Sequence, residues 1–494
     1  MGQLRFVIPR PERIAPDAPQ RAYFAGTEGI PWECRNSYHD GLLAIERETR
    51  ESGNLHFPWT VPGHGEWMLS SASLMERVKP YNLPVELARG TLNRIRNQAW
   101  LWQSAGMQLT EPYLATLKRG TIEFAKAASG QAHPAAAADR ADLALQHAFD
   151  ALTLLTREYS HQVLAIRRSH AAQLPTLFGA RLESVPDGAM ATGFLAAFNT
   201  ALVSPCWREI EATAGQYQWD SLDRQLQWCK DNDLRVCLGP VMALDTRNLP
   251  DWLYLWEDEP EELQSYINGF LKAVVQRYRG RVQLWHVASR VNVPGAIHIS
   301  EEDRLKMVVD ALQQVRMIDT RTPTIISFDQ PWAEYIAKQD QELSPVHFAD
   351  TLVRGELGLA GIGLEWNMGY WPAGTMPRDG LEVSRQIDRW TQLGVPLVVF
   401  LALPSGLDAD PLAKHPGKPL PNWMPGGASP KTQQAIAEWL LPLLLAKQAV
   451  QAIFWNQLRD DVPHDFPHAG LFDARRRAKP ALQTIADLRR EFIG

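Results

Sequence analysis

The sequence predicts an α/β protein with a (β/α)8 TIM barrel, preceded by a small β-rich domain and a helical hairpin. Short apolar runs alternate with helical segments eight times over about 320 residues, which matches such a barrel in count and size. The first apolar run is followed by residues 179–187, which contain no Gly-rich phosphate turn of the kind usual in doubly wound sheets. Residues 361–371 begin as an apolar strand and end in polar and aromatic side chains, the layout expected at a barrel mouth.

Length and charge limit the classes of protein that this chain can represent. A chain of 494 residues is too long for one core. We expect a β-rich domain at 1–82, a helical region at 83–172 and the barrel at 173–494. The net charge of −6 argues against nucleic acid and anionic membrane as partners. No apolar stretch in the sequence is long enough to cross a bilayer.

The four cysteines show neither C-x-x-C pairs nor zinc spacing, so we expect reduced, buried thiols. The first residues lack the apolar run of a signal peptide, which favours a cytoplasmic location, although a removed leader would leave the same sequence. No cofactor is expected.

The first 82 residues contain short alternating runs at 41–47 and 67–74 between Gly and Pro turns, which predicts a small sheet or sandwich. The chain contains 18 Trp, and flat aromatic faces favour a carbohydrate ligand. Trp32, Trp59 and Trp67 form either a binding face or part of the core. The domain is interpreted as a carbohydrate-binding module or as a contact between copies of the chain.

Residues 83–104, 111–128 and 135–169 carry apolar positions at helical spacing and predict a helical hairpin that connects the domains. Barrel strands are expected to begin near residues 177, 199, 234, 282, 324, 360, 396 and 449. Barrel helices are expected at 220–231, 261–279, 301–318, 345–354, 381–393, 431–446 and 480–490.

A family resemblance rests on several motifs in consistent order. Residues 207–220, with Asp223 and 228–232, resemble the second β/α unit of glycoside hydrolase family 10, the xylanase-type barrels. The other matching segments are 248–252, 284–290, 361–365, 470–473 and 479–481. The resemblance spans about 175–490 and implies hydrolysis of β-linked polysaccharides with retention, by two glutamates about 5 Å apart.

The chain departs from the family at the residues that carry the reaction. The acid/base glutamate, which follows an Asn at the end of strand four, aligns with Arg290 after Ser289. The nucleophile position at the end of strand seven holds Ala402. The Lys and Asn that grip the sugar are missing from 203–207, and the strand-three His is absent near Gly239. The family's double displacement therefore does not carry over to this chain.

Glu365 and Asp329 are the candidates for a relocated catalytic pair. Glu365 stands among Trp366, Tyr370 and Trp371, and desolvation there is expected to raise its pKa, as suits a general acid. Asp329 is the candidate base or nucleophile. In the alternative reading, Glu365 forms an ion pair with Arg290 or Arg459, and Asp329 makes a local hydrogen bond in its loop.

Polar and aromatic side chains at the other strand ends are expected to bind the sugar. This set contains His286, Arg290, Gln330, Trp332, Trp366, Asn367, Tyr370, Trp371, Asn456, Gln457, Arg459 and Asp460. His286 has a second reading as a core histidine. His464 and His468 lie near aspartates, but their spacing fits no standard metal site, so none is expected.

Three functional hypotheses remain open. The first is a glycoside hydrolase-like enzyme with relocated carboxylates, and the second is a non-catalytic carbohydrate-binding barrel. The third is an unrelated barrel reaction, such as a metal-assisted one. The expected partner is an oligo- or polysaccharide, not nucleic acid or membrane, and self-association stays open. A carboxyl separation of about 5 Å would favour retention and about 6.5–9.5 Å inversion, whereas a carboxyl directed into the core would favour binding.

Overall fold

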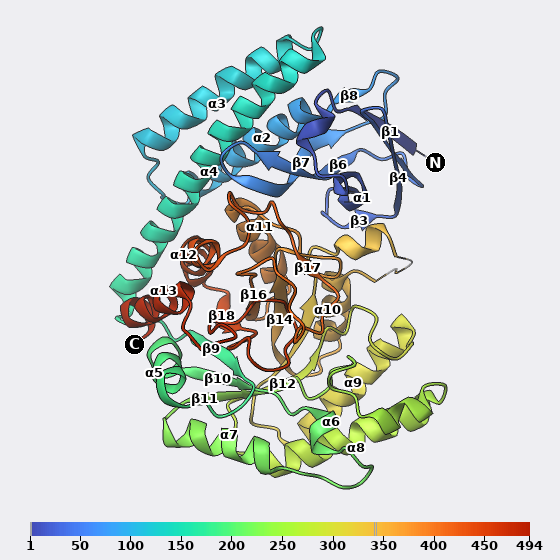
Figure 1. Cartoon of the computed structure of the whole chain (residues 1–494), viewed down its shortest axis with the longest axis vertical. Helices are drawn as coiled ribbons and strands as arrows, with labels where there is room; N and C mark the ends of the chain where they lie inside the picture. The colour runs from blue at the N-terminus through green and yellow to red at the C-terminus, as the bar shows by residue number, and fades with distance from the viewer. Residues whose placement is uncertain (1, 340, 342) are drawn as a thin grey trace.

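The centre of the molecule is a closed barrel of eight parallel strands (Figure 1). The computed structural model describes residues 2–339, 341 and 343–494. The barrel strands are β9 (Leu177–Leu182), β10 (Thr200–Val203), β11 (Arg235–Leu238), β12 (Leu284–Ser289), β13 (Thr324–Asp329), β14 (Leu359–Asn367), β16 (Leu397–Ala402) and β18 (Val450–Trp455). They pair in chain order, and β18 closes the barrel against β9. The predicted (β/α)8 fold is confirmed.

Helices surround this barrel. They are α5 (Gly188–Ala197), α6 (Trp207–Ile210), α7 (Asp220–Asp231), α8 (Pro260–Tyr278), α9 (Glu301–Ile318), α10 (Pro345–Arg354), α11 (Gly380–Thr391), α12 (Pro430–Ala446) and α13 (Pro480–Leu488). Shorter turns are η1 (Pro11–Arg13), η2 (Asp251–Trp256), η3 (Glu334–Ala337) and η4 (Arg489–Ile493), and the two-residue strands β15 (Tyr370–Trp371) and β17 (Lys418–Pro419) pair in a loop.

Local signals account for most of these helices. The predicted bounds of α7, α9 and α10 are confirmed. Ser300 and Ser344 directly precede α9 and α10 and cap them, since each hydroxyl accepts a backbone N–H of the first turn. Asp379 caps α11 in the same way. The prediction missed α5. Its sequence GAMATGFLAA carries no charged side chain, so it has no polar face to reveal a helical period.

Residues 2–82 form two four-stranded sheets, seen at the top of Figure 1. The strands are β1 (Gly2–Val7), β2 (Tyr23–Ala25), β3 (Pro31–Trp32), β4 (Cys34–His39), β5 (Leu42–Arg47), β6 (Gly53–Val61), β7 (Gly65–Leu74) and β8 (Tyr81–Asn82), with the short helix α1 (Ala18–Arg21). Trp59 and Trp67 are buried. Trp32 lies under the Arg47 guanidinium, whose carbon is 5.0 Å from the centroid of the Trp32 ring. These three rings belong to the packing rather than to a binding face.

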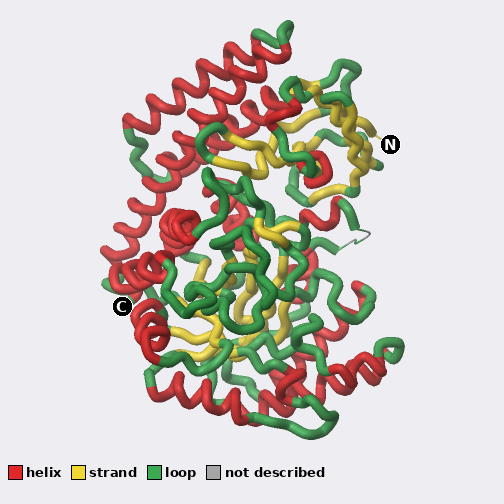
Figure 2. The backbone as a smooth tube through the Cα atoms, viewed as in Figure 1, coloured by secondary structure: helices red, strands yellow, loops and turns green. Residues whose placement is uncertain are grey.

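Three long helices join this region to the barrel, as Figure 2 shows. They are α2 (Leu83–Ser104), α3 (Glu111–Ser129) and α4 (Pro134–His170). Small residues on α4 such as Ala137, Ala141 and Ala148 are buried, which lets α4 pack closely against α3 and α2. Among the described residues, none of the helices combines the length and the apolar character needed to traverse a bilayer.

The N-terminal sheets dock beside the C-terminal ends of the barrel strands. The buried Arg378 donates to the Tyr23 hydroxyl at 2.8 Å and is ion-paired with Glu334. The backbone N–H groups of Glu66 and Met68 donate to the carbonyls of Asn422 and Pro377 at 2.7 and 3.0 Å. These contacts fix the N-terminal region next to the mouth of the barrel.

Candidate functional site

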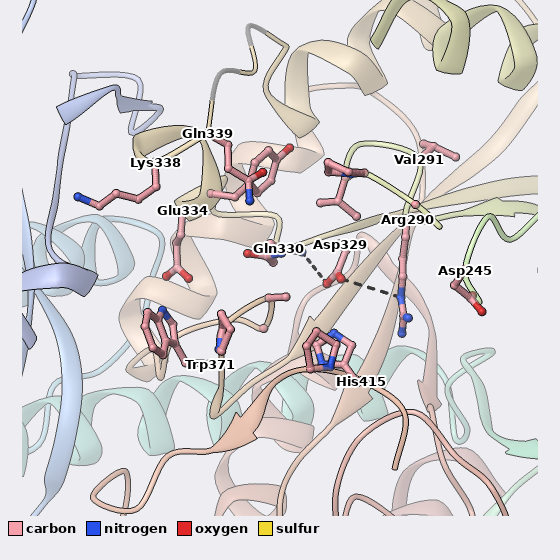
Figure 3. Close-up of a pocket in the computed structure, with 18 of the residues that line it drawn as sticks. Asp245, Arg290, Val291, Asp329, Gln330, Glu334, Lys338, Gln339, Trp371 and His415 are labelled. Atoms are coloured by element: carbon pink, nitrogen blue, oxygen red, sulfur yellow. Dashed lines mark hydrogen bonds and ion pairs between the residues drawn. The ribbon is translucent and has the colours of Figure 1, made fainter. Parts of the chain in front are cut away.

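A cavity of about 630 Å³ opens at the C-terminal ends of the barrel strands (Figure 3). Its walls come from the loops after β11, β12, β13, β15 and β16, from α9, and from Gln20–Tyr23 of the N-terminal region. Of the residues that the sequence placed in the site, four line this cavity: Arg290, Asp329, Gln330 and Trp371. The C-terminal strand ends are the part of such barrels that carries function.

Arg290 is the centre of a charge network on the floor of the cavity. Its Nε lies 2.9 Å from Glu365 Oε2 and 3.9 Å from Asp329 Oδ2, and its Nη2 lies 3.5 Å from Asp465 Oδ2. Asp329 and Glu365 are register partners on neighbouring strands, so both point inward at the same level. The guanidinium therefore contacts both carboxyl groups of the expected catalytic pair.

Glu365 is held in its ionised form. Burial acts to raise the pKa of Glu365. Arg290 and the Ser327 hydroxyl, which donates to Oε1 at 2.7 Å, act to lower this pKa and together outweigh burial, so the net shift is downward. The expectation that desolvation would raise the pKa of Glu365 is wrong, because a buried cation outweighs the loss of water. The structure shows the ion pair that the alternative reading proposed, and Glu365 is absent from the cavity wall.

Asp329 has the opposite environment. Burial raises its pKa to about 7, and the nearby Glu365 charge adds to the effect of burial while Arg290 opposes it. Its Oδ1 accepts the Gln330 N–H at 2.8 Å and the Asn367 amide at 3.1 Å. Asp329 lines the cavity, so near neutral pH it can present a proton to a ligand.

Two further residues hold these groups in place. His286 Nε2 lies 2.8 Å from the Ser327 hydroxyl, and burial lowers the pKa of His286 to about 3, so the ring stays neutral. His286 is thus the core histidine of the alternative reading, and its hydrogen bond holds the Ser327 hydroxyl in place. Asn292, which the sequence reasoning missed, donates to the Asp329 carbonyl at 2.8 Å and accepts the Asp329 N–H at 2.9 Å.

Most of the aromatic side chains that were expected to bind the sugar are buried outside the cavity. Trp366 is fully buried and packs against Trp332 at a centroid distance of 5.5 Å, because successive strand residues point to opposite faces and Glu365 takes the inner one. Trp332 is buried and donates to Glu382 at 3.2 Å. Tyr370 is also fully buried, with its hydroxyl donating to the Pro467 carbonyl. These three rings do not line the cavity.

The group after β18 also lies apart from the cavity. Asp460 accepts the Lys479 ammonium at 2.6 Å and the Gln457 amide at 2.8 Å, and Arg459 is ion-paired with Asp461. Asn456 is buried, and its amide lies 3.4 Å from Asn367 Oδ1. Internal partners therefore use the polar groups that were expected to bind a sugar, and none of these residues lines the cavity.

The position expected for the nucleophile is filled by packing. Ala402 is fully buried in a small cluster with Tyr370, Phe466 and Ala469. Phe466 also lies under Arg290, whose guanidinium carbon is 5.3 Å from the ring centroid. Apolar side chains from the loop after β18 thus occupy the space next to this strand end.

Asp465 and Arg247 extend the network beyond Arg290, and neither was among the residues expected to bind the sugar. Their carboxylate and guanidinium lie 3.0 Å apart, and Arg247, Arg290 and Arg181 keep the pKa of Asp465 far below its usual range despite burial. Both lie well inside long loops, Arg247 after β11 and Asp465 after β18, so no strand-end pattern marks them. In the same loop, His464 bonds Asp410 at 3.0 Å. Within the part of the chain that the structure describes, no cluster of three or more His, Cys, Asp or Glu has the geometry to hold a metal ion.

A closed (β/α)8 barrel with an arginine and carboxylate network at its strand ends belongs to the broad class of barrels that use this end as their site. Residues 196–296 match the family model described as glycosyl hydrolase family 10. The resemblance that the sequence motifs indicated is therefore confirmed over the segment from before β10 to beyond Arg290.

Individual relatives are distant. Endo-1,4-beta-xylanase B of Thermotoga neapolitana is 28% identical over 83 residues, which are 17% of this chain and 23% of that protein. The native xylanase 10B from Thermotoga maritima is similar in structure, with a TM-score of 0.49 and 17% identity, over 66% of this chain and 98% of that one. The GH10 protein from Paenibacillus barcinonensis gives a TM-score of 0.49 and 16% identity, over 67% of this chain and 98% of that one.

Proposed function

We propose that the barrel mouth binds a carbohydrate and does not hydrolyse it by the family's double displacement. The observation that carries this proposal is the contact of Arg290 with both Glu365 and Asp329. A retaining pair needs one carboxylate free to attack the sugar and one free to donate a proton. Here one guanidinium lies against both groups, and Glu365 is outside the cavity wall.

The choice of a carbohydrate rests on the family match and on the lining of the cavity. Trp371 is half-buried at the rim and offers an aromatic face for a sugar ring. Gln330 and the protonated form of Asp329 offer hydrogen-bond donors on the floor. The matched relatives are xylanases by name, so β-1,4-linked xylose oligosaccharides are the first ligands to examine.

A second candidate function is hydrolysis with Asp329 as general acid. It is favoured by the pKa of Asp329 near 7 together with its place in the cavity wall. This reaction would need water activated by a base other than Glu365, since Glu365 is held by Arg290 and Ser327.

Calorimetric titration with xylose- and glucose-based β-1,4 oligosaccharides tests the proposal. We expect saturable binding by the wild type and about tenfold weaker binding by Trp371→Ala, because a stacked aromatic contact is worth about 0.5–1.5 kcal/mol beyond the area that it buries. Trp100→Ala is the matched control, since Trp100 is 66% exposed on α2 and lies outside the cavity wall. Absence of binding to every oligosaccharide would refute the proposal.

A hydrolysis screen with the same sugars separates the two candidates. Turnover by the wild type that disappears in Asp329→Asn, with sugar binding retained, would establish the second candidate. Binding without turnover in both proteins would support the first.

A further inference from the structure

We propose that the cavity receives the end of a carbohydrate chain, a few sugar units long, and not the interior of a polymer. This inference rests on the proposed function and adds the class of ligand. It follows from how the cavity is bounded, since parts of the molecule far apart in the sequence close it on two sides.

The N-terminal region forms the first boundary. Gln20–Tyr23, which runs from α1 into β2, belongs to the cavity wall. This segment is fixed in place, because Arg21 is buried and ion-paired with Glu66 at 2.5 Å. Tyr23, also buried, accepts a hydrogen bond from Arg378 of the barrel at 2.8 Å. Removing one partner of a buried ion pair is strongly destabilising, so these contacts hold the wall in place on this side of the cavity.

The loop after β18 forms the second boundary, beyond Arg290. Asp465 is ion-paired with Arg247 at 3.0 Å and Arg290 at 3.5 Å, and Phe466 packs against Arg290 and the ring of His415. His415 itself lines the cavity, whereas Asp465 and Phe466 do not. The loop therefore packs behind Arg290 and His415, and no residue of β18 or β9 is among those that line the cavity.

The size of the cavity agrees with a short ligand. Its volume of about 630 Å³ falls within the range of about 300–1,000 Å³ that small-molecule sites occupy. The interior of a polymer needs a groove that is open at both ends, so that the chain can enter and leave. A cavity lined by Gln20–Tyr23 on one side and by His415, with Phe466 packed behind it, on the other accepts a chain terminus.

The first test measures affinity against oligosaccharide length, with the β-1,4 xylose and glucose series from one to six units. We expect affinity to rise over about the first two to four units and then stay level, because further units extend into solvent. Affinity that still rises from four to six units would contradict the inference and leave the proposed function intact. Absence of binding at every length would instead refute the proposed function.

The second test compares chain ends with chain interiors. Xylan or β-glucan, whichever series binds, is prepared at two average lengths and offered at equal mass. Binding at chain ends makes the number of sites proportional to the number of chains, so the shorter preparation should bind several-fold more protein. Equal capacity of the two preparations would show binding along the chain and overturn the inference.

A variant of the wall locates the ligand. Gln20 is exposed at the cavity wall, so Gln20→Trp narrows the cavity from the N-terminal side without disturbing buried packing. We expect at least tenfold weaker binding of the longest oligosaccharide that the wild type holds fully, and a smaller loss for the monosaccharide. Gln103→Trp, on the exposed face of α2, is the matched control. Equal affinities of Gln20→Trp and wild type would show that the ligand does not reach this wall.

Discussion

Arg290 follows β12 directly, with a φ of 56°, and its side chain contacts three carboxylates. A non-glycine residue in this left-handed region is uncommon and is sustained only when its surroundings hold it firmly. Here Glu365, Asp465 and Asp329 supply that restraint. At the position where the family resemblance implies a proton-donating glutamate, this chain has a permanent cation that binds the neighbouring acids.

Loss of the Glu365 charge is expected to destabilise the fold. In Glu365→Gln, Arg290 keeps only the more distant carboxylates, and breaking a buried ion pair costs about 3 kcal/mol. Urea unfolding measures this loss, with the exposed Glu438→Gln as control, for which we expect less than about 0.5 kcal/mol. A loss below about 1 kcal/mol in Glu365→Gln would show that the pair contributes little.

Asp329 should make stability depend on pH. Its pKa of about 7 in the folded protein lies above the value near 4 of an unfolded chain, so the folded state holds an extra proton between these values. Stability from this group is therefore present at low pH and is lost as pH rises through about 7. We expect Asp329→Asn to gain stability relative to wild type between pH 5 and pH 8, measured by urea unfolding. An unchanged difference across this range would contradict the assigned pKa.

At the scale of the element, β14 directs its polar side chains to one face and its large apolar side chains to the other. Gly361, Gly363, Glu365 and Asn367 share one face of the strand, and Leu364 and Trp366 share the other. A Cβ at Gly363 would lie 2.6 Å from Ser327 Cβ, so glycine allows the close approach that brings Ser327 under Glu365. The alternation places Trp366 in the core, although it follows directly after a residue of the charge network.

Trp366→Phe is expected to lower the free energy of unfolding by about 1–3 kcal/mol, because it leaves a void in the packing between β14 and the helices. Sugar affinity, measured by titration at low temperature, should stay within twofold of wild type, since Trp366 lies outside the cavity wall. Trp371→Ala gives the opposite combination, with weaker binding and a smaller effect on stability. A large loss of sugar affinity in Trp366→Phe would contradict this prediction and show that Trp366 contributes to sugar binding.

At the scale of the whole molecule, the N-terminal sheets lie next to the barrel, and the long helix α4 runs from them along its side (Figures 1 and 2). Arg94 of α2 is ion-paired with Asp379 at 2.9 Å, directly before α11 of the barrel. Arg378, one residue earlier, reaches the Tyr23 hydroxyl. Adjacent barrel residues thus bind two separate parts of the first 170 residues, which couples the cavity wall to the barrel.

Arg378→Met is expected to weaken both the fold and the cavity. Arg378 is fully buried, and its loss leaves Glu334 without its cation, at a cost of about 3–5 kcal/mol. Tyr23 loses its anchor at the same time, so sugar affinity should fall together with stability. Arg385→Met removes a side chain that is 53% exposed and should cost less than about 1 kcal/mol. Stability and affinity both unchanged in Arg378→Met would mean that this contact does not hold the wall.

The sequence by itself determined the barrel, because the signals involved are local. Apolar strands, helical periods and caps such as Ser300, Ser344 and Asp379 act within a few residues of each element, so the positions of the helices that they begin could be predicted. The same locality identified Arg290, Asp329, Gln330 and Trp371, since polar and aromatic residues near a strand's C-terminal end fall at the mouth. It failed for α5, which carries no polar face.

Only the tertiary structure decided which of these polar groups meet. The downward pKa shift of Glu365 depends on Arg290, 75 residues away in the chain, and the pairing of Asp460 with Lys479 depends on how a loop folds back. The role of Gln20–Tyr23 as a cavity wall depends on the docking of the N-terminal sheets. Electrostatic energies follow distance and burial in space, and neither can be read from the order of residues along the chain.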